Sequence, residues 1–251
     1  MKRALASDFD NTLFFRDTEE RFRAQDIFDI MFFQKSGGIF GICTGRSPDS
    51  VLETIGTFIR PDFIIAASGA LTIDGSGKIL KECCMDLETV RQIRQMMAGK
   101  AEMVFHAGGK VYSIENPEYP LQIRIRSLEE LPQSVYGISM RLPSVEEAAG
   151  AAEEIRRRFG STAQPHVNIN HIDVAPAGCS KAVGVRAVRE YYNIDCMGGI
   201  GDSFNDLPLL EAADVGFTFD TAPAQLKEAA DMIVLSVSDA ISKLQAMDKD
   251  E

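Results

Sequence analysis

The sequence predicts an α/β protein, a doubly wound parallel sheet with a smaller α+β domain inserted into the chain. Short apolar segments alternate with helical segments at both ends of the 251 residues, which is typical of parallel strands covered by helices on both faces. Residues from about 72 to 172 instead contain hairpin turns and one-sided strands, which favour an antiparallel sheet. We therefore expect a Rossmann-like core formed by residues 1–71 and 173–251, and an inserted domain formed by residues 72–172.

The N-terminal part of the core is expected to contain three strands separated by two helices. The strands are predicted at RALASDFD, GIFGICTG and DFIIAASGA, and the first helix is predicted between Thr18 and Gln34. The second helix should begin at Pro48, because the Ser47 side chain can cap it and proline fits the first helical position.

The C-terminal part returns to the same alternation. Strands are predicted at CMGGIGD, VGFTF and MIVL, and helices at SKAVGVRAVREYYN and NDLPLLEAA. Pro208 falls in the first turn of the second helix, where its missing N–H does no harm. Both ends of the chain are therefore expected to form one sheet.

The inserted segment has a different pattern. Turn signals at Asp74-Gly75 and Gly108-Gly109 predict two hairpins. DLETVRQIRQMMAG has the apolar spacing of an amphipathic helix, and Ser144 with Glu147 forms a capping box that predicts the start of another. LQIRIRSL and VYGISMRL alternate as strands with one apolar face.

Composition limits the partners and the compartment. With 26 basic and 37 acidic residues the formal net charge is −11, so nucleic acid and anionic membranes are poor partners, although a small anionic substrate is compatible with a local cation. The five cysteines contain no C-x-x-C pair, which favours free thiols in the cytosol. The N-terminus reaches Asp8 before any long apolar run, and no segment approaches the roughly 18 apolar residues of a membrane span. We expect a soluble cytoplasmic protein.

Two aspartates interrupt the first predicted strand near its end. Asp8 and Asp10 are two residues apart, so in an extended chain their side chains point to the same side. Two carboxylates this close repel each other and are costly to bury. Their presence therefore indicates a functional role, the alternative being a pair that caps turns at the end of the strand.

Three further polar segments lie at predicted strand ends or helix starts: Thr44-Gly45-Arg46, Ser180-Lys181, and GDSFND with Asp202, Asn205 and Asp206. Open α/β sheets bind ligands at these positions. Converging carboxylates suit Mg²⁺, which prefers oxygen ligands and often shares a substrate phosphate. Lys181, Thr44 and Gly45 supply an ammonium, a hydroxyl and N–H donors for phosphate oxygens. Such a site fits phosphoryl transfer, with one aspartate as the nucleophile.

These four segments resemble a known set of motifs. DFDNT is similar to the D-x-D-x-T signature of the haloacid dehalogenase superfamily of phosphohydrolases, and TGR, the lysine of GCSK, and GDSFND resemble its other three motifs in the same order. By its position, the insertion is similar to the type IIB cap of the Cof-like sugar-phosphate phosphatases.

The resemblance implies a role for each matching residue. Asp8 would be the nucleophile that forms an aspartyl-phosphate and would also bind Mg²⁺. Asp10 would be the general acid and base, with its backbone carbonyl on the metal. Asp202 would be a metal ligand, and Asp206 would bind the metal through water or support the site. The phosphate would be bound by Thr44, Gly45, Lys181 and Asn205.

Specificity residues are predicted with alternatives left open. Arg46 could bind substrate or form a structural salt bridge, and Ser68 stands where Cof-like relatives often have asparagine. Arg124 and Arg126 alternate with isoleucines, so they could meet a second anionic group or form a solvated face. His106, beside a predicted hairpin tip, is a further candidate.

The predicted function is Mg²⁺-dependent hydrolysis of a small phosphorylated metabolite, with sugar phosphates as the first candidates. A phosphotransferase or phosphomutase would use the same motifs. A non-catalytic phosphate-binding regulator is the alternative from another class, but it would not need all the catalytic carboxylates.

Overall fold

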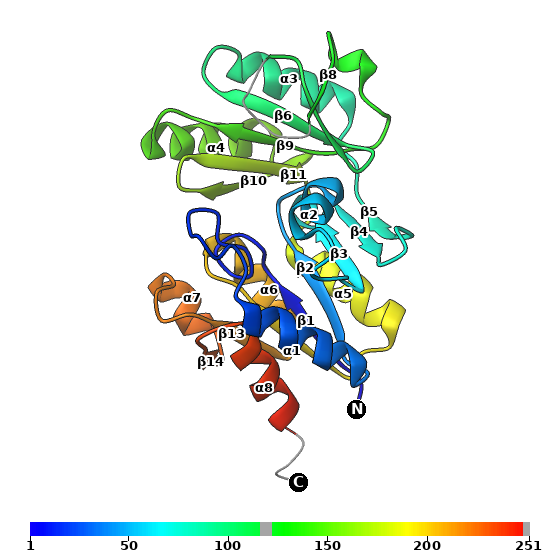
Figure 1. Ribbon diagram of the computed structural model, residues 1–251. Helices are drawn as coiled ribbons and strands as arrows, with labels where there is room; N and C mark the ends of the chain where they lie inside the picture. The colour runs from blue at the N-terminus through cyan, green and yellow to red at the C-terminus, as the bar shows by residue number, and fades with distance from the viewer. Residues whose placement is uncertain (116–121, 248–251) are drawn as a thin grey trace.

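The computed structural model describes residues 1–115 and 122–247, and within them the chain forms two sheets, one of eight strands and one of six. Each sheet belongs to its own domain, and the two domains lie one above the other (Figure 1). The eight-stranded sheet contains both ends of the chain, as the sequence predicts, and the six-stranded sheet comes from the middle.

The strands of the core sheet run in the order β14-β13-β12-β1-β2-β3-β4-β5. Pairs from β14 to β3 are parallel, and the pairs β3–β4 and β4–β5 are antiparallel. The bounds are β1 (Arg3–Ser7), β2 (Ile39–Cys43), β3 (Phe63–Ala66), β4 (Leu71–Asp74), β5 (Ile79–Glu82), β12 (Cys196–Ile200), β13 (Val215–Thr218) and β14 (Met232–Ile233).

Helices cover both faces of the core sheet, which confirms the doubly wound architecture. Alternate residues of β1 point to opposite layers, since Leu5 packs in one apolar cluster and Ala6 in another. The first cluster includes α1 (Ala24–Lys35), α2 (Pro48–Ile55) and α8 (Val237–Ala246), and the second includes α5 (Lys181–Tyr192), α6 (Leu207–Ala212) and α7 (Ala224–Ala229). Among the described helices, none has both the length and the apolar composition needed to cross a lipid bilayer.

The second sheet has the order β10-β11-β9-β6-β7-β8 and is antiparallel except for the pair β7–β8. Two helices pack on one face, and the opposite face is directed towards the core. The bounds are α3 (Leu87–Met97), β6 (Glu102–Ala107), β7 (Lys110–Ser113), β8 (Gln122–Arg124), β9 (Val135–Arg141), α4 (Val145–Phe159), β10 (Ala163–Asn168) and β11 (His171–Pro176).

The predicted helix caps are present. Ser47 accepts the backbone N–H of Ser50 at the start of α2, and Ser144 accepts that of Glu147 at the start of α4. The first helix lies in the region where it was predicted, from Thr18 to Gln34, although it begins only at Ala24 and ends at Lys35. The Thr18 hydroxyl lies near the carbonyls of Phe15 and Glu20, and such local bonds compete with helix formation.

The boundaries expected at residues 72 and 172 do not match the sheets. The hairpin formed by β4 and β5, which was assigned to the inserted domain, extends the core sheet because β4 pairs with β3. At the other end β11 stays in the second sheet as far as Pro176, although the core was expected to resume at residue 173. The segment from α3 to β11 is called the inserted domain below.

Candidate active site

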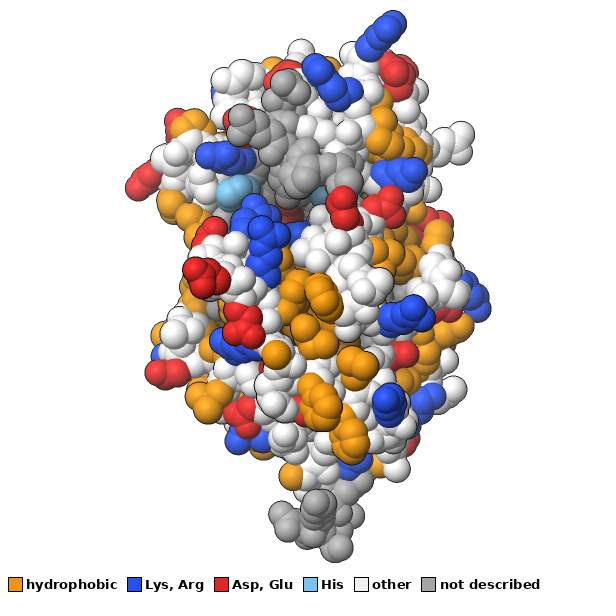
Figure 2. All heavy atoms as spheres, viewed as in Figure 1, with side chains coloured by type: hydrophobic (Ala, Val, Ile, Leu, Met, Phe, Trp, Pro, Cys, Tyr) orange, Lys and Arg blue, Asp and Glu red, His pale blue; other side chains and the backbone are white. Residues whose placement is uncertain are grey.

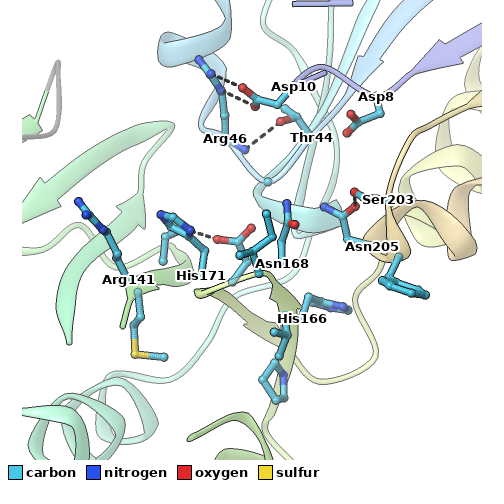
Figure 3. A pocket seen from close by; sticks show the side chains of 18 of the residues that line it. Asp8, Asp10, Thr44, Arg46, Arg141, His166, Asn168, His171, Ser203 and Asn205 are labelled. Carbon is cyan, nitrogen blue, oxygen red and sulfur yellow. Dashed lines mark hydrogen bonds and ion pairs between the residues drawn. The ribbon is translucent and has the colours of Figure 1, made fainter. Parts of the chain in front are cut away.

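A pocket of about 1430 Å³ lies between the two domains and contains most of the predicted site residues. Side chains from the core form one wall, among them Asp8, Asp10, Thr44 and Arg46, and side chains from the inserted domain form the other, among them Arg141, His166, Asn168 and His171 (Figure 3). Figure 2 shows basic and histidine side chains gathered at the level where the domains meet. The volume exceeds the ~300–1,000 Å³ of common small-molecule pockets, so a metabolite fits.

Asp8 and Lys181 form a buried ion pair at the carboxyl end of the core sheet. The Lys181 Nζ lies 2.6 Å from Asp8 Oδ1 and also donates to Asp206. The Asp8 N–H donates to the Ile200 carbonyl and so continues the pairing of β1 with β12. Lys181 is only 2 % exposed and Asp8 5 % exposed, so both side chains are fixed from several directions.

The charges of this cluster do not balance. Burial, followed by the Asp206 carboxylate, raises the pKa of Asp8 well above its usual range, and Lys181 opposes the shift. Burial alone would lower the pKa of Lys181, but Asp206 and Asp8 together raise it well above its usual range. Burial and Asp206 also raise the pKa of Asp202 to about 6. The three carboxylates therefore outnumber the single ammonium, and a further cation would relieve their repulsion.

Three of the predicted metal ligands can converge on one ion. Carboxylate oxygens of Asp8, Asp202 and Asp206 lie within 4.8 Å of one another, and an all-oxygen set fits Mg²⁺. Asp206 is largely occupied, since Oδ1 accepts from Lys181 and Oδ2 accepts the backbone N–H groups of Asp202 and Ser203 at 3.1 and 3.0 Å. This arrangement suits a supporting role for Asp206.

Arg46 holds Asp10 through two hydrogen bonds. Its Nε and Nη2 lie 2.8 and 2.5 Å from the two Asp10 carboxylate oxygens, and its guanidinium lies over the rings of Phe9 and Phe14. Of the two alternatives for Arg46, the structure shows the salt bridge. The Asp10 side chain is 43 % exposed, so it faces the pocket, and Asn11 after it adopts the positive φ of 62°.

The Thr44-Gly45 segment approaches the inserted domain closely. A Cβ at Gly45 would lie 2.4 Å from Asp173 Oδ2, so any side chain at this position would require the Asp173 carboxylate to move. Ser68 packs beside the same loop, where its N–H donates to the Thr44 carbonyl and its φ is 55°. Asn205, the other predicted phosphate-binding residue, lines the pocket and accepts a hydrogen bond from Ser203 Oγ at 2.7 Å.

The structure does not bring Arg124 and Arg126 to the pocket. Both are exposed, and neither is among the described residues that line it. Strand β8 ends at Arg124 and is the outermost strand of its sheet, beyond β7 and β6. Arg141 on β9 lies in the pocket instead, opposite His171 of β11.

The pocket also contains two polar residues that the sequence analysis missed, Ser139 and Asp173. They lie on the polar face of β9 and β11, together with His106 of β6, which was predicted. In HIDVAP the apolar Ile172 and Val174 alternate with polar residues, so this pattern, shortly before the motif lysine, could have identified Asp173.

His106 makes the stability of the protein depend on pH. It is 5 % exposed, and burial lowers its pKa to about 4. At this site the unfolded chain, with an ordinary histidine pKa, therefore binds more protons, so the contribution of His106 to stability falls as the pH drops from about 7 towards 4. Between pH 7 and pH 5 we expect wild type to lose about 2 kcal/mol more than His106→Gln. Urea unfolding at both pH values measures this difference, and equal losses would contradict it.

Comparisons with known proteins show which family this chain resembles. The family model for the haloacid dehalogenase-like hydrolases matches residues 5–244. A Haemophilus influenzae protein provisionally named a phosphatase is 23 % identical over 93 % of this chain and 92 % of its own. A solved Plasmodium vivax protein provisionally described as a HAD/COF-like hydrolase has a TM-score of 0.86 and 20 % identity, with 98 % of this chain and 96 % of its own covered. A haloacid dehalogenase-like hydrolase of B. subtilis has a TM-score of 0.83 and 18 % identity, with coverages of 98 % and 99 %. The chain belongs to the haloacid dehalogenase-like hydrolases, as its four motifs predicted.

Proposed function

We propose that the protein is a Mg²⁺-dependent phosphatase that hydrolyses a small phosphomonoester, with sugar phosphates as the preferred class. The observation that carries this proposal is the cluster of Asp8, Lys181, Asp202 and Asp206, of which Asp8 and Asp202 line the pocket while Lys181 and Asp206 are buried. A carboxylate nucleophile, an ammonium beside it and further oxygen ligands are the parts that phosphoryl transfer requires.

The reaction would proceed in two steps on Asp8. A carboxylate oxygen of Asp8 attacks phosphorus, the bond to the ester oxygen breaks, and Asp10 gives a proton to the departing alkoxide. Asp10 then takes a proton from a water molecule that attacks the phosphorus of the aspartyl-phosphate, which releases phosphate and restores Asp8. For the first step the Asp10 side chain would exchange Arg46, its present partner, for the leaving oxygen.

The other residues would stabilise the transferring group. Lys181 lies 2.6 Å from Asp8 Oδ1 and would offset negative charge on the phosphoryl oxygens, while Thr44 and the Gly45 N–H would donate to them. Asp8, Asp202 and the Asp10 carbonyl would hold Mg²⁺, with Asp206 in support, and the bound ion would neutralise charge on the phosphoryl group. The inserted domain forms the opposite wall of the pocket and would exclude bulk water.

Phosphate release from a panel of phosphorylated metabolites and one aryl phosphate tests the proposal. After removal of divalent metal with a chelator we expect release to fall to background, and addition of Mg²⁺ should restore it. A transferase or mutase would instead give a phosphorylated second product without free phosphate. Release that is equal with and without divalent metal would contradict the proposal.

A further inference from the structure

Three polar side chains of the inserted domain form a connected chain above the catalytic cluster. Ser139 Oγ lies 2.6 Å from Asp173 Oδ1 and 2.7 Å from His106 Nε2. Strand register explains the arrangement, because Asp173 is directly opposite Ser139 in the pair β11–β9. His106 is opposite Gly137, two residues from Ser139 and on the same face of the sheet.

The direction of the hydrogen bonds follows from the donors available. A carboxylate accepts only, so the Ser139 hydroxyl gives its one proton to Asp173 and accepts from His106 Nε2–H. His106 is buried and neutral at pH 7, so its single ring proton is on Nε2. Its Nδ1 is buried without a hydrogen-bond partner in the described part of the chain. Both protons of this hydrogen-bonded chain, that of the Ser139 hydroxyl and that of His106 Nε2, are therefore used within it. The chain holds Asp173 Oδ1 in one position.

The second oxygen of Asp173 remains directed at the core. Oδ2 is the atom that a Cβ at Gly45 would meet at 2.4 Å. Burial raises the pKa of Asp173, while the hydrogen bond from Ser139 and the charge of Lys181 oppose this shift. The carboxylate thus lies beside the residues that would hold the phosphoryl group. It would repel phosphoryl oxygens, so its partner must be a hydrogen-bond donor on the organic part of the substrate.

A hydroxyl is a donor that a carboxylate in this pocket can bind. The pocket is lined by Arg16, Arg46, Arg141 and Arg156 but also by Asp8, Asp10, Glu102 and Asp202, so these charges offset one another and give no net preference for a cationic substrate. A neutral hydroxyl on a carbon near the ester needs no compensating charge, and a carboxylate is a strong acceptor for it.

We propose that Asp173, positioned by Ser139 and His106, binds a hydroxyl group near the phosphate ester and so selects phosphorylated sugars and polyols over non-hydroxylated esters. This inference rests on the proposed function, because it deepens the specificity of the same site. Asp173 is a binding residue here, whereas Ser139 and His106 act through it.

Asp173→Asn gives a sharp test, because it keeps the size of the side chain. With its Oδ1 held by Ser139, asparagine would present an NH₂ group in place of Oδ2, so an acceptor becomes a donor. We expect kcat/KM for a sugar phosphate to fall about 10- to 100-fold, mainly through KM. For an aryl phosphate and for the deoxy analogue of the same sugar phosphate, the change should stay within about 3-fold.

Ser139→Ala and Ser139→Thr form a matched pair. Alanine removes the hydroxyl that positions Asp173 and should raise KM for the hydroxylated substrate alone, while threonine keeps the hydroxyl and should restore it. An equal loss on all substrates, or no loss on any, would overturn the inference.

A binding measurement tests this inference separately from the proposed catalytic function. Calorimetry of the sugar phosphate with Asp8→Asn, and with Asp8→Asn combined with Asp173→Asn, measures recognition without turnover. About 10-fold weaker binding in the double variant supports the role of Asp173 even if wild type releases no phosphate. Equal binding by both variants overturns that role even if wild type is an active phosphatase.

Discussion

Asp8→Asn is expected to lower phosphate release by roughly 10⁴-fold or more under saturating Mg²⁺. Asparagine has the size of aspartate, but its amide cannot attack phosphorus and form the acyl phosphate. The fold should survive the substitution. Burial already raises the pKa of the Asp8 carboxyl, and a neutral side chain at this position relieves the repulsion with Asp206 and Asp202. Steady-state release of phosphate measures the loss, and rapid quenching followed by mass determination should find the phosphoryl adduct in wild type alone.

Asp26→Asn provides the matched control for this variant. Asp26 is also a fully buried carboxylate, but it lies on α1 and accepts the Ser238 N–H at 2.8 Å, outside the pocket. We expect its substitution to change stability and to leave kcat close to the wild-type value. If Asp8→Asn kept wild-type turnover, a different residue would be the nucleophile.

The cluster of Asp8, Lys181, Asp202 and Asp206 could be predicted from the sequence because its parts follow from local rules. Parallel strands end at one edge of a sheet, so polar residues after β1, β2 and β12 must meet there. Lys181 joins them as the first residue of α5. Two residues apart in a nearly extended chain, Asp8 and Asp10 were recognisable as a pair without any knowledge of tertiary contacts.

The wall of the pocket that the inserted domain forms could not be predicted in the same way. Which residues of the inserted domain face the pocket depends on the order and register of β6, β9 and β11, which are far apart in the sequence. Arg124 and Arg141 both alternate with apolar residues, yet only the central strand β9 carries its arginine into the pocket, while β8 is at the sheet edge. The hairpin β4–β5 was assigned to the wrong domain for the same reason. Only the pairing of β4 with β3 shows that it belongs to the core sheet.

Lys181→Met should both inactivate and destabilise the protein. Methionine keeps much of the side-chain volume but removes the ammonium between Asp8 and Asp206. Because Lys181 is 2 % exposed, water cannot replace it, and breaking a buried ion pair in this way typically lowers the free energy of unfolding by about 3–5 kcal/mol. Loss of a charged group that stabilises the transferring phosphoryl oxygens should lower kcat by roughly 10²- to 10³-fold. Urea unfolding in the presence of a chelator, together with phosphate release in Mg²⁺, measures the two effects.

The double variant Lys181→Met/Asp206→Asn separates these effects. Neutralising Asp206 removes one of the two carboxylates left without a cationic partner, so part of the lost stability should return, while kcat stays low because no ammonium faces the phosphoryl group. Added Mg²⁺ should stabilise Lys181→Met against urea, since a bound cation would offset the same carboxylates. If the single variant were as stable as wild type in chelator, Asp8 and Asp206 would not depend on Lys181 for charge compensation. If instead the double variant recovered activity along with stability, the role of Lys181 would be structural, and the phosphoryl group would need another cationic partner.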